Sequence, residues 1–592
     1  MPVSALDAPD RHVCIATAHG TIEVHSWDSS SRVLTQATSR QEGTHRAAIE
    51  PAGEWIWWFD DRDGDECGVW RRQRFGAGPG EQTVDATGLA PSQPAGLALG
   101  RRNVAVVGVV DRRDEYRVLR LGLDGSADPL LLYQHRQAVS VGPLNADSTQ
   151  LSLIHSEHGD SRHPAVRVLD TSGNAVVGDL WDGPGLGVRP IGFAPAFGDD
   201  RLLVRHDRHG RPGLLLWRVG TGEQSELDLA VPGEVAAASW YQDGCAVLVA
   251  VSHHGRTRLH RVDLAVGGMA VSAVQPVGPT TGTVSALTTT PGGDAWFLWS
   301  SAADPPTIRN LVGEPVVAPP GPAAPPSVPV TDLWVDGPGG PVHALLRLPP
   351  SLGRQRTDRY LPLVIDCHGG PAAHDSDLFR AGPAAWVDHG FAVVQINYRG
   401  STGYGTGWRD AIAERVGHTE LADVVAVRDH LVRVGIADPR RVVLSGHSWG
   451  GYLTLLGLGR YPDRWSVGLA TSPIADYLVA YADESEDLKA FDRSLFGGSP
   501  EQVGEKYRDA SPLTYVPEIQ VPLWIAAGRA DPRCPWRQIL SYVDALKRYR
   551  ITHELYHYDA GHGSLADAER IRQMGMKLDF VARYLAPRSW LR

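Results

Sequence analysis

Hydrophobic and polar residues alternate with a period of two along most of the first 315 residues, which is the pattern of half-buried β-strands. No long stretch before about residue 375 has apolar residues at helical spacing. Short apolar runs follow turn-forming Gly, Pro, Asn or Asp residues and recur roughly every 45 to 50 residues. These runs occupy residues 54–59, 103–110, 150–154, 201–205, 245–251 and 295–299.

Repeats of this length are typical of four-stranded propeller blades, so the spacing predicts a β-propeller over residues 1–315. Counting from His12 gives about seven repeats, and we expect seven blades. A pair of β-sandwiches would also consist of short alternating strands. Nothing in a sandwich would produce the regular repeat, so the propeller is the preferred interpretation.

Downstream of the repeats the pattern changes twice. Residues 316–330 are rich in proline, which predicts an extended linker. Beyond it, apolar strand-like runs alternate with segments at helical spacing, such as 419–434, which ends at Gly435. This alternation predicts a mostly parallel α/β domain over residues 331–592.

Composition agrees with a soluble globular protein, since 42% of the residues are apolar and 21% are charged. The net charge of −11 disfavours nucleic acid or an anionic membrane as a partner, because neither would be attracted at long range. No run approaches the roughly 18 apolar residues that cross a bilayer. The opening residues show no basic segment or apolar core, so we expect no signal peptide. Five scattered cysteines without a C-x-x-C pair favour a cytoplasmic location.

The strongest chemical signal is Gly-His-Ser-Trp-Gly at residues 446–450. An apolar, β-branched run at 441–445 precedes it, and an apolar helical run at 450–456 follows. Strand, tight turn and helix form the context in which G-x-S-x-G makes a nucleophile elbow. The turn strains the serine backbone and needs small neighbours, so we expect Ser448 to be a nucleophile.

A serine nucleophile needs a base, and the base needs an orienting carboxylate. In the α/β-hydrolase order the acid and then the histidine follow the serine. Asp531 comes just after the apolar strand 521–528, and His562 lies on a glycine-flanked loop after the strand-like run 553–558. Asp559 is the rival acid, but it is only three residues from His562 and is expected to shape the local turn.

A site for the oxyanion is expected where the strand 361–366 runs into His-Gly-Gly-Pro at 368–371. Glycines there allow backbone N–H groups to point into the site. In α/β-hydrolases such an N–H acts together with that of the residue after the nucleophile, which is Trp449 in this chain.

These motifs resemble the prolyl oligopeptidase family of serine peptidases, and within it the acylaminoacyl peptidase-type branch. Asn-Tyr-Arg-Gly-Ser-Thr-Gly-Tyr-Gly at 397–405, Asp-Pro-Arg at 531–533 and Gly-His-Gly at 561–563 contribute to the resemblance, which covers about residues 330–592. It implies a propeller followed by an α/β-hydrolase domain. The residue roles that it implies are a triad of Ser448, Asp531 and His562, an oxyanion hole of the Gly370 and Trp449 N–H groups, and a substrate carbonyl bound by Arg533.

One residue departs from the pattern of that branch. The elbow usually carries tyrosine after the serine, whereas this chain has Trp449. The oxyanion hole needs only the backbone N–H of this residue, so the departure concerns the shape of the pocket and not the chemistry.

The expected function is that of a serine hydrolase that cleaves amide bonds of short peptides or aminoacyl compounds from the N-terminal end through an acyl-enzyme. One alternative is a small-molecule aminoacyl amidase or esterase that acts on a natural product or antibiotic. The other is an inactive propeller scaffold, against which the intact Ser448, Asp531 and His562 argue. We expect no cofactor and no metal, and the sequence leaves open whether the chain forms a homo-oligomer.

Several further residues have ordinary interpretations. His155, His158 and His163 lack matched metal-ligand spacing, and Cys534 is expected to be a packed loop thiol. Arg399 is expected to anchor local structure. A weaker hypothesis is that Glu157 and Asp160, two acids of the propeller, bind the free amine of a substrate.

Overall fold

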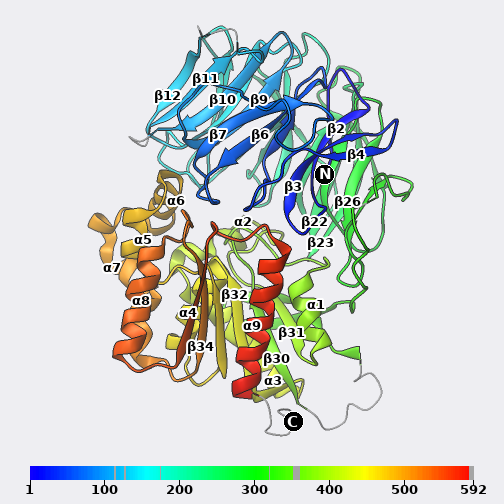
Figure 1. The fold of residues 1–592 in the computed structure, drawn as a ribbon. Helices are drawn as coiled ribbons and strands as arrows, with labels where there is room; N and C mark the ends of the chain where they lie inside the picture. Colours follow the sequence, from blue (N-terminus) through cyan, green and yellow to red (C-terminus); the bar gives the residue numbers. More distant parts are fainter. Residues whose placement is uncertain (112–114, 126–127, 174, 319, 351–359, 586–592) are drawn as a thin grey trace. The chain divides into compact units, whose positions relative to one another are not determined.

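The computed structural model describes residues 1–592 except 112–114, 126–127, 174, 319, 351–359 and 586–592. The chain forms two compact units, an all-β unit and an α/β unit (Figure 1). The all-β unit comprises residues 1–62, 66–299 and 307–323, and the α/β unit comprises 63–65, 300–306 and 324–592. The all-β unit therefore continues to Ala323, into the segment predicted as a linker.

In the described residues the all-β unit is a propeller of seven sheets, as the repeat spacing predicted. Each sheet is a meander in which every strand is hydrogen-bonded to the next one along the chain. The first three blades are β1–β4 (Val3–Ser4, Arg11–Thr17, Ile22–Asp28, Val33–Gln36), β5–β8 (Ala47–Ile49, Trp55–Asp61, Gly68–Arg74, Val84–Asp85) and β9–β12 (Gln93–Gly100, Val104–Val110, Tyr116–Leu121, Leu130–His135).

The remaining four blades follow in sequence order. They are β13–β16 (Val139–Leu144, Gln150–His155, Ala165–Asp170, Val176–Leu180), β17–β20 (Val188–Phe193, Arg201–His206, Gly213–Arg218, Glu223–Leu227), β21–β24 (Glu234–Trp240, Ala246–His253, Arg256–Leu264, Val271–Val277) and β25–β27 (Thr283–Thr289, Ala295–Ser300, Thr307–Asn310).

The apolar runs that revealed the repeat are the second strands of blades two to seven. Such a strand has a hydrogen-bonded neighbour on each side, and its two faces pack against adjacent blades. In β10, Val104–Val110, every residue is buried. A strand covered on both faces is apolar at nearly every position, so its period-two signal disappears and a continuous hydrophobic run marks each blade.

The first and last blades meet through side chains. Trp27 of β3 lies 5.6 Å from Trp296 of β26, measured between ring centroids, and His12 of β2 stacks on Trp27 at 4.7 Å. Val316 and Val317, which lie in the segment predicted as a linker, pack against the same cluster. Among the described residues, no hydrogen-bonded sheet contains strands of both blades.

The α/β unit contains an eight-stranded sheet in the order β28-β29-β31-β30-β32-β33-β34-β35. The strands β28 and β29 are antiparallel to their neighbours, and all other pairs are parallel. In chain order the strands are β28 Thr331–Gly337, β29 Gly340–Arg347, β30 Leu361–Cys367, β31 Ala392–Asn397, β32 Ala437–His447, β33 Val467–Thr471, β34 Leu523–Gly528 and β35 His553–Tyr558.

Helices lie on both faces of this sheet (Figure 1). The predicted helix 419–434 is confirmed as α3, His418–Arg433, and it ends before Gly435, which has the left-handed φ of 75° expected at a helix stop. No helix among the described residues is both long and apolar enough to cross a membrane. The other helices are α1 Ala381–Asp388, α2 Thr406–Asp410, α4 Trp449–Arg460, α5 Tyr477–Asp483, α6 Glu486–Phe496, α7 Pro500–Ala510, α8 Trp536–Arg548 and α9 Asp567–Leu585, with 3-10 turns at Ala411–Glu414 and Pro512–Glu518.

Parallel strands bring their carboxyl ends to one edge of the sheet, where α/β proteins place their sites. The strands β30, β32, β34 and β35 end at this edge. The loops that carry the predicted site residues follow these four strands, so the topology gathers them.

Candidate active site

Ser448 occupies the sharp turn between β32 and α4. Its backbone angles, φ 57° and ψ −120°, lie in a region that residues with a Cβ rarely adopt. The Ser448 N–H donates to the carbonyl of Thr471 at 2.9 Å, which ties the turn to the end of β33. This geometry is that of a nucleophile elbow.

The two glycines of the elbow are required by close backbone approach. A Cβ at Gly446 would lie 2.2 Å from the carbonyl carbon of Gly450. A Cβ at Gly450 would lie 1.9 Å from the carbonyl oxygen of Cys367, at the end of β30. Any side chain at either position would overlap with backbone, which explains physically the small residues in the motif.

His562 is paired with Asp531. The Nδ1–H of His562 donates to the Asp531 carboxylate at 2.9 Å, and the Asp531 side chain is 1% exposed. The other carboxylate oxygen accepts the N–H groups of Arg533 and Cys534, each at 2.9 Å. These bonds fix the carboxylate and hold the imidazole in the tautomer that leaves Nε2 free to accept a proton.

Asp559, the rival acid, does not contact His562 in this way. Its side chain is 85% exposed and lies 3.8 Å from Arg529. His562 is instead held beside the elbow by His447, whose Nε2–H donates to the His562 carbonyl at 3.0 Å. The structure thus pairs His562 with Asp531 and holds His562 beside His447, the residue that precedes Ser448 in the elbow.

Cys534 lies next to this pair, with its sulfur within 4.8 Å of ligand atoms of Asp531 and His562. Burial raises the pKa of its thiol well above the usual range, and the Asp531 charge adds to this effect. The thiol is therefore protonated and packed. The three side chains could in principle meet a metal ion, but Asp531 and His562 are already bonded to each other.

The His368–Pro371 loop runs directly beside the serine. A Cβ at Gly369 would lie 3.3 Å from the Cβ of Ser448, and Gly370 has a φ of 136°, which favours glycine. The peptide between these two glycines carries the N–H of Gly370. The loop therefore has the position and the backbone freedom that an oxyanion-binding N–H requires.

This loop is supported by the segment that follows β31. The imidazole of His368 stacks on the ring of Tyr398 at 4.3 Å and accepts a hydrogen bond from the hydroxyl of Ser401 at 2.9 Å. The Tyr398 hydroxyl donates to the His368 carbonyl at 2.7 Å. Burial lowers the pKa of His368 to about 4, so the ring is neutral at pH 7. The sequence motif contained Tyr398 and Ser401, but nothing in it indicated this supporting role.

Residues 378–588 match the model of the prolyl oligopeptidase family. The match covers most of the α/β unit, and this part of the chain is similar to that family. The acylamino-acid-releasing enzyme of Rattus norvegicus is 31% identical over 216 residues, which are 35% of this chain and 29% of that enzyme. The chain thus matches about 29% of the length of this curated relative.

Two solved structures resemble nearly the whole chain. A crystal structure of puromycin hydrolase has a TM-score of 0.82 at 20% identity and covers 98% of this chain and 94% of its own. An acylaminoacyl peptidase of Pyrococcus horikoshii has a TM-score of 0.72 at 15% identity, with coverage of 97% and 94%. These likenesses establish the fold, a propeller with an α/β-hydrolase domain, and the resemblance inferred from the sequence is confirmed.

The side chain of Trp449 is directed into the core of the α/β unit. Its indole N–H donates to a carboxyl oxygen of Glu420 at 3.2 Å, and its ring lies 5.1 Å from that of Tyr452. Glu420 is fully buried, and burial raises its pKa to about 8. The protonated acid thus fixes the indole of the residue whose backbone N–H is predicted to bind the oxyanion. Sequence reasoning missed Glu420, which lies on α3.

We expect the stability of the protein to depend on pH through Glu420. Folded Glu420 keeps its proton up to about pH 8, whereas the unfolded side chain loses it near pH 4.3, so the folded state binds more protons between these values. Stability therefore falls as the pH rises through this window. The Glu420→Gln variant lacks this loss, and at pH 8.5 its stability relative to wild type should exceed that at pH 5 by at most about 5 kcal/mol.

Thermal unfolding midpoints of both proteins at pH 5, 7 and 8.5 check this expectation. Other buried acids titrate equally in the two proteins, so their contributions cancel in the difference. Parallel pH curves for the two proteins would show that Glu420 is ionised in the folded state.

The two arginines singled out by the sequence differ in environment. Arg399 donates through its side chain to Asp423, at 3.0 Å from Nε, and to the carbonyl of Thr419. Arg399 therefore anchors local structure, as predicted. Arg533 is exposed beside the Asp531 loop, and its role as a ligand of a substrate carbonyl stays a prediction.

The propeller acids considered for a free substrate amine are engaged within their own blade. Glu157 accepts from both terminal nitrogens of Arg167, and Asp160 accepts the Nδ1–H of His163 at 2.7 Å. His158 stacks on Trp181 at 3.9 Å. Glu157, Asp160 and His158 thus have structural contacts within their own blade.

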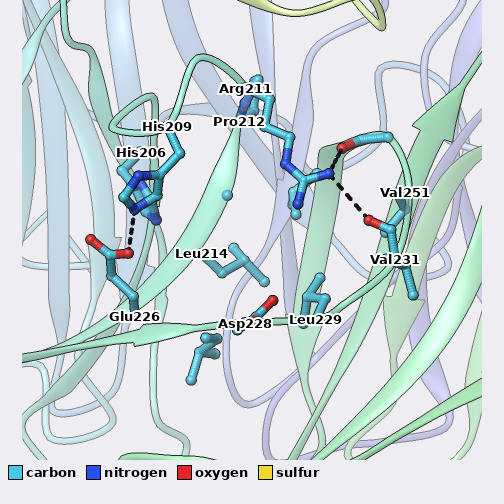
Figure 2. Close-up of a pocket in the computed structure, with 14 residues that line it drawn as sticks. His206, His209, Arg211, Pro212, Leu214, Glu226, Asp228, Leu229, Val231 and Val251 are labelled. Atoms are coloured by element: carbon cyan, nitrogen blue, oxygen red, sulfur yellow. Dashed lines mark hydrogen bonds and ion pairs between the residues drawn. The ribbon is translucent and has the colours of Figure 1, made fainter.

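A cavity of about 310 Å³ lies in the propeller between the fifth and sixth blades (Figure 2). Figure 2 shows His209 turned toward Glu226, at 2.6 Å, and Arg211 bonded to the carbonyl oxygens of Val231 and Gly233. Its charged groups are therefore bound to one another or to backbone. The cavity carries no arrangement of groups that suggests chemistry.

Proposed function

We propose that the chain is a serine peptidase that releases N-acylated aminoacyl groups from short peptides. The observation that carries the proposal is the strained Ser448 elbow beside the bonded His562–Asp531 pair. The intact constellation argues against an inactive scaffold. The match to acylamino-acid-releasing enzymes in the catalytic domain supports the peptidase class.

In the proposed mechanism Ser448 attacks the scissile carbonyl while His562 accepts its proton, and Asp531 stabilises the resulting imidazolium. The N–H groups of Gly370 and Trp449 bind the developing oxyanion, each worth about 3 kcal/mol in comparable sites. His562 then protonates the leaving amine. Water repeats the cycle on the acyl-enzyme, and no cofactor is needed for any step.

A free α-ammonium would need a carboxylate, because a charge taken from water without a partner is strongly unfavourable. Glu157 and Asp160, the two acids hypothesised from the sequence for this role, are bound to Arg167 and His163. A blocked amino end needs no such partner, and this favours an acylated substrate.

A second candidate function is that of an aminoacyl amidase acting on a small molecule. The likeness to a structure named puromycin hydrolase over nearly the whole chain suggests it. Both candidates use the same catalytic groups and differ in what binds beside them.

The test compares N-acetyl-alanyl and alanyl p-nitroanilides, with puromycin as a third substrate. We expect kcat/KM to be at least about tenfold higher for the acetylated anilide, equivalent to about 1.4 kcal/mol. Faster turnover of the free amine overturns the acyl specificity and favours an aminopeptidase, whereas turnover of puromycin alone supports the second candidate. If no substrate is cleaved and a fluorophosphonate does not label the folded protein, the hydrolase proposal fails.

A further inference from the structure

Two buried carboxylic acids lie side by side in the hydrolase domain, away from the triad. Glu484 follows α5 and Asp492 lies on α6, and their side chains are hydrogen-bonded to each other. Glu484 is 5% exposed and Asp492 is 4% exposed. Carboxylates are rarely buried unless a positive partner or a hydrogen-bond donor compensates them.

The pair retains unused hydrogen-bonding capacity. One oxygen of each acid, Oε1 of Glu484 and Oδ2 of Asp492, has no hydrogen-bond partner among the described residues. The fully buried hydroxyl of Tyr477, on α5, is also without a partner there, and the charges of both acids act on it. Three acceptor oxygens match the three N–H donors of a primary ammonium, and a guanidinium offers five.

The pair is connected to the active site from two directions. Ser448 is bonded to Thr471 at the end of β33, and the chain runs from there directly into α5. On the other side Cys534, whose N–H binds the catalytic Asp531, is within the electrostatic influence of both acids. Figure 1 shows α5, α6 and α7 grouped next to α8, and α5 contacts all three of the other helices.

A chain of packed aromatic rings leads from the elbow toward the acids. Tyr452, one turn after Ser448, lies 5.1 Å from the ring of Trp449 and 5.2 Å from that of Tyr477. The ring of Tyr477 in turn lies 5.2 Å from that of Phe496. An α-ammonium sits directly beside the scissile carbonyl and does not extend past these rings. A long apolar stem with a charged end does, and this describes lysine and arginine.

We propose that Glu484 and Asp492, together with the Tyr477 hydroxyl, bind the cationic end of a lysine or arginine side chain on the substrate residue whose carbonyl Ser448 attacks. This specificity rests on the proposed peptidase function and names its substrate class. A metal ion fits less well, because the described residues place no third ligand group with these two acids.

The electrostatics of the pair agree with this role. Burial raises the pKa of both acids well above the usual range, and the Asp492 charge raises that of Glu484 further. A bound cation favours the ionised acids, so its binding releases protons and strengthens as the pH rises from 6 to 9. The groups that interact with the pair from the surrounding elements are Tyr452, Tyr477, Glu486, Lys489, Arg493, Tyr507 and Cys534.

The test compares N-acetyl-lysyl and N-acetyl-norleucyl p-nitroanilides, which differ by the ammonium group. We expect wild-type kcat/KM to be at least about tenfold higher for the lysyl substrate, equivalent to about 1.4 kcal/mol. The ratio of lysyl to norleucyl kcat/KM should fall to about one or below in Asp492→Asn and in Glu484→Gln, because each variant removes one of the two negative charges that attract the cation. Asp483→Asn is the matched control, since Asp483 ends α5 and is paired with the exposed Arg537, and it should keep the wild-type ratio.

A wild-type ratio near one, or a ratio that both folded acid variants retain, overturns the proposal and leaves the pair with a structural role only. If neither variant folds, benzamidine decides on the wild type: competitive inhibition of norleucyl turnover that strengthens from pH 6 to 8.5 supports the site, and its absence at millimolar benzamidine overturns it. If the wild type cleaves no amide, the proposed function has failed. Calorimetric binding of benzamidine to wild type and to Asp492→Asn then tests the cation site separately.

Discussion

Replacing Ser448 by alanine lowers kcat on any amide substrate by at least about 10⁴-fold, and labelling by a fluorophosphonate disappears. The reason is that the acyl-enzyme cannot form, and the oxyanion donors and His562 then act on a bound substrate without a nucleophile. The measurement is single-turnover hydrolysis together with labelling, because both report directly on the hydroxyl.

Ser541→Ala is the control for this experiment. Ser541 lies on α8, and its hydroxyl donates only to the carbonyl of Arg537 at 3.3 Å. This variant should be labelled and should turn over substrate like wild type. The double variant Ser448→Ala/His562→Ala should lose little beyond the single variant, since groups that act as a unit are not additive. Retained labelling of Ser448→Ala would assign the nucleophile to another residue.

Gly450→Ala is expected to destabilise the hydrolase domain by more than about 3 kcal/mol, a loss that overpacking of backbone against backbone can reach. The added Cβ would lie 1.9 Å from the carbonyl oxygen of Cys367, and neither the start of α4 nor the end of β30 can move without breaking the elbow. The measurement is the midpoint of thermal unfolding, followed by near-ultraviolet circular dichroism.

Gly575→Ala provides the matched control, because Gly575 is also a helical glycine. It lies in α9, and a Cβ there meets no atom within 4 Å. Alanine has the higher helix propensity, so this variant should be stabilised by up to about 1 kcal/mol. A Gly450→Ala midpoint close to that of wild type would mean that the elbow backbone tolerates displacement.

The features that could be predicted from the sequence are those that a local pattern encodes. The second strand of each blade is covered on both faces and is therefore apolar along its length, so a hydrophobic run recurs in the sequence once per blade. The elbow needs two glycines within one turn, and the chain order of Asp531 and His562 follows from which strands precede them. In each case neighbouring residues in the sequence carry the physical constraint.

The features that could not be predicted depend on partners far apart in the chain. Glu420 meets Trp449 only because α3 packs beside α4, and in the sequence it is an ordinary helical glutamate. Asp492 occurs in α6 among other charged residues and reads as part of a solvated face, yet it is buried against Glu484. Burial of a charged side chain is decided by tertiary packing, and a single sequence does not record it.

The way in which the propeller ring closes affects how the number of blades can change in evolution. Among the described residues each blade is built from one contiguous stretch of chain, because the sheet of the last blade contains no strand from the N-terminal segment that forms the first. Duplication or deletion of one such stretch, about 45 to 50 residues, would change the number of blades without dividing any sheet. The first and last blades could still close the ring through side chains, as Trp27 and Trp296 do. The blade number of this architecture is thus open to change by simple tandem recombination.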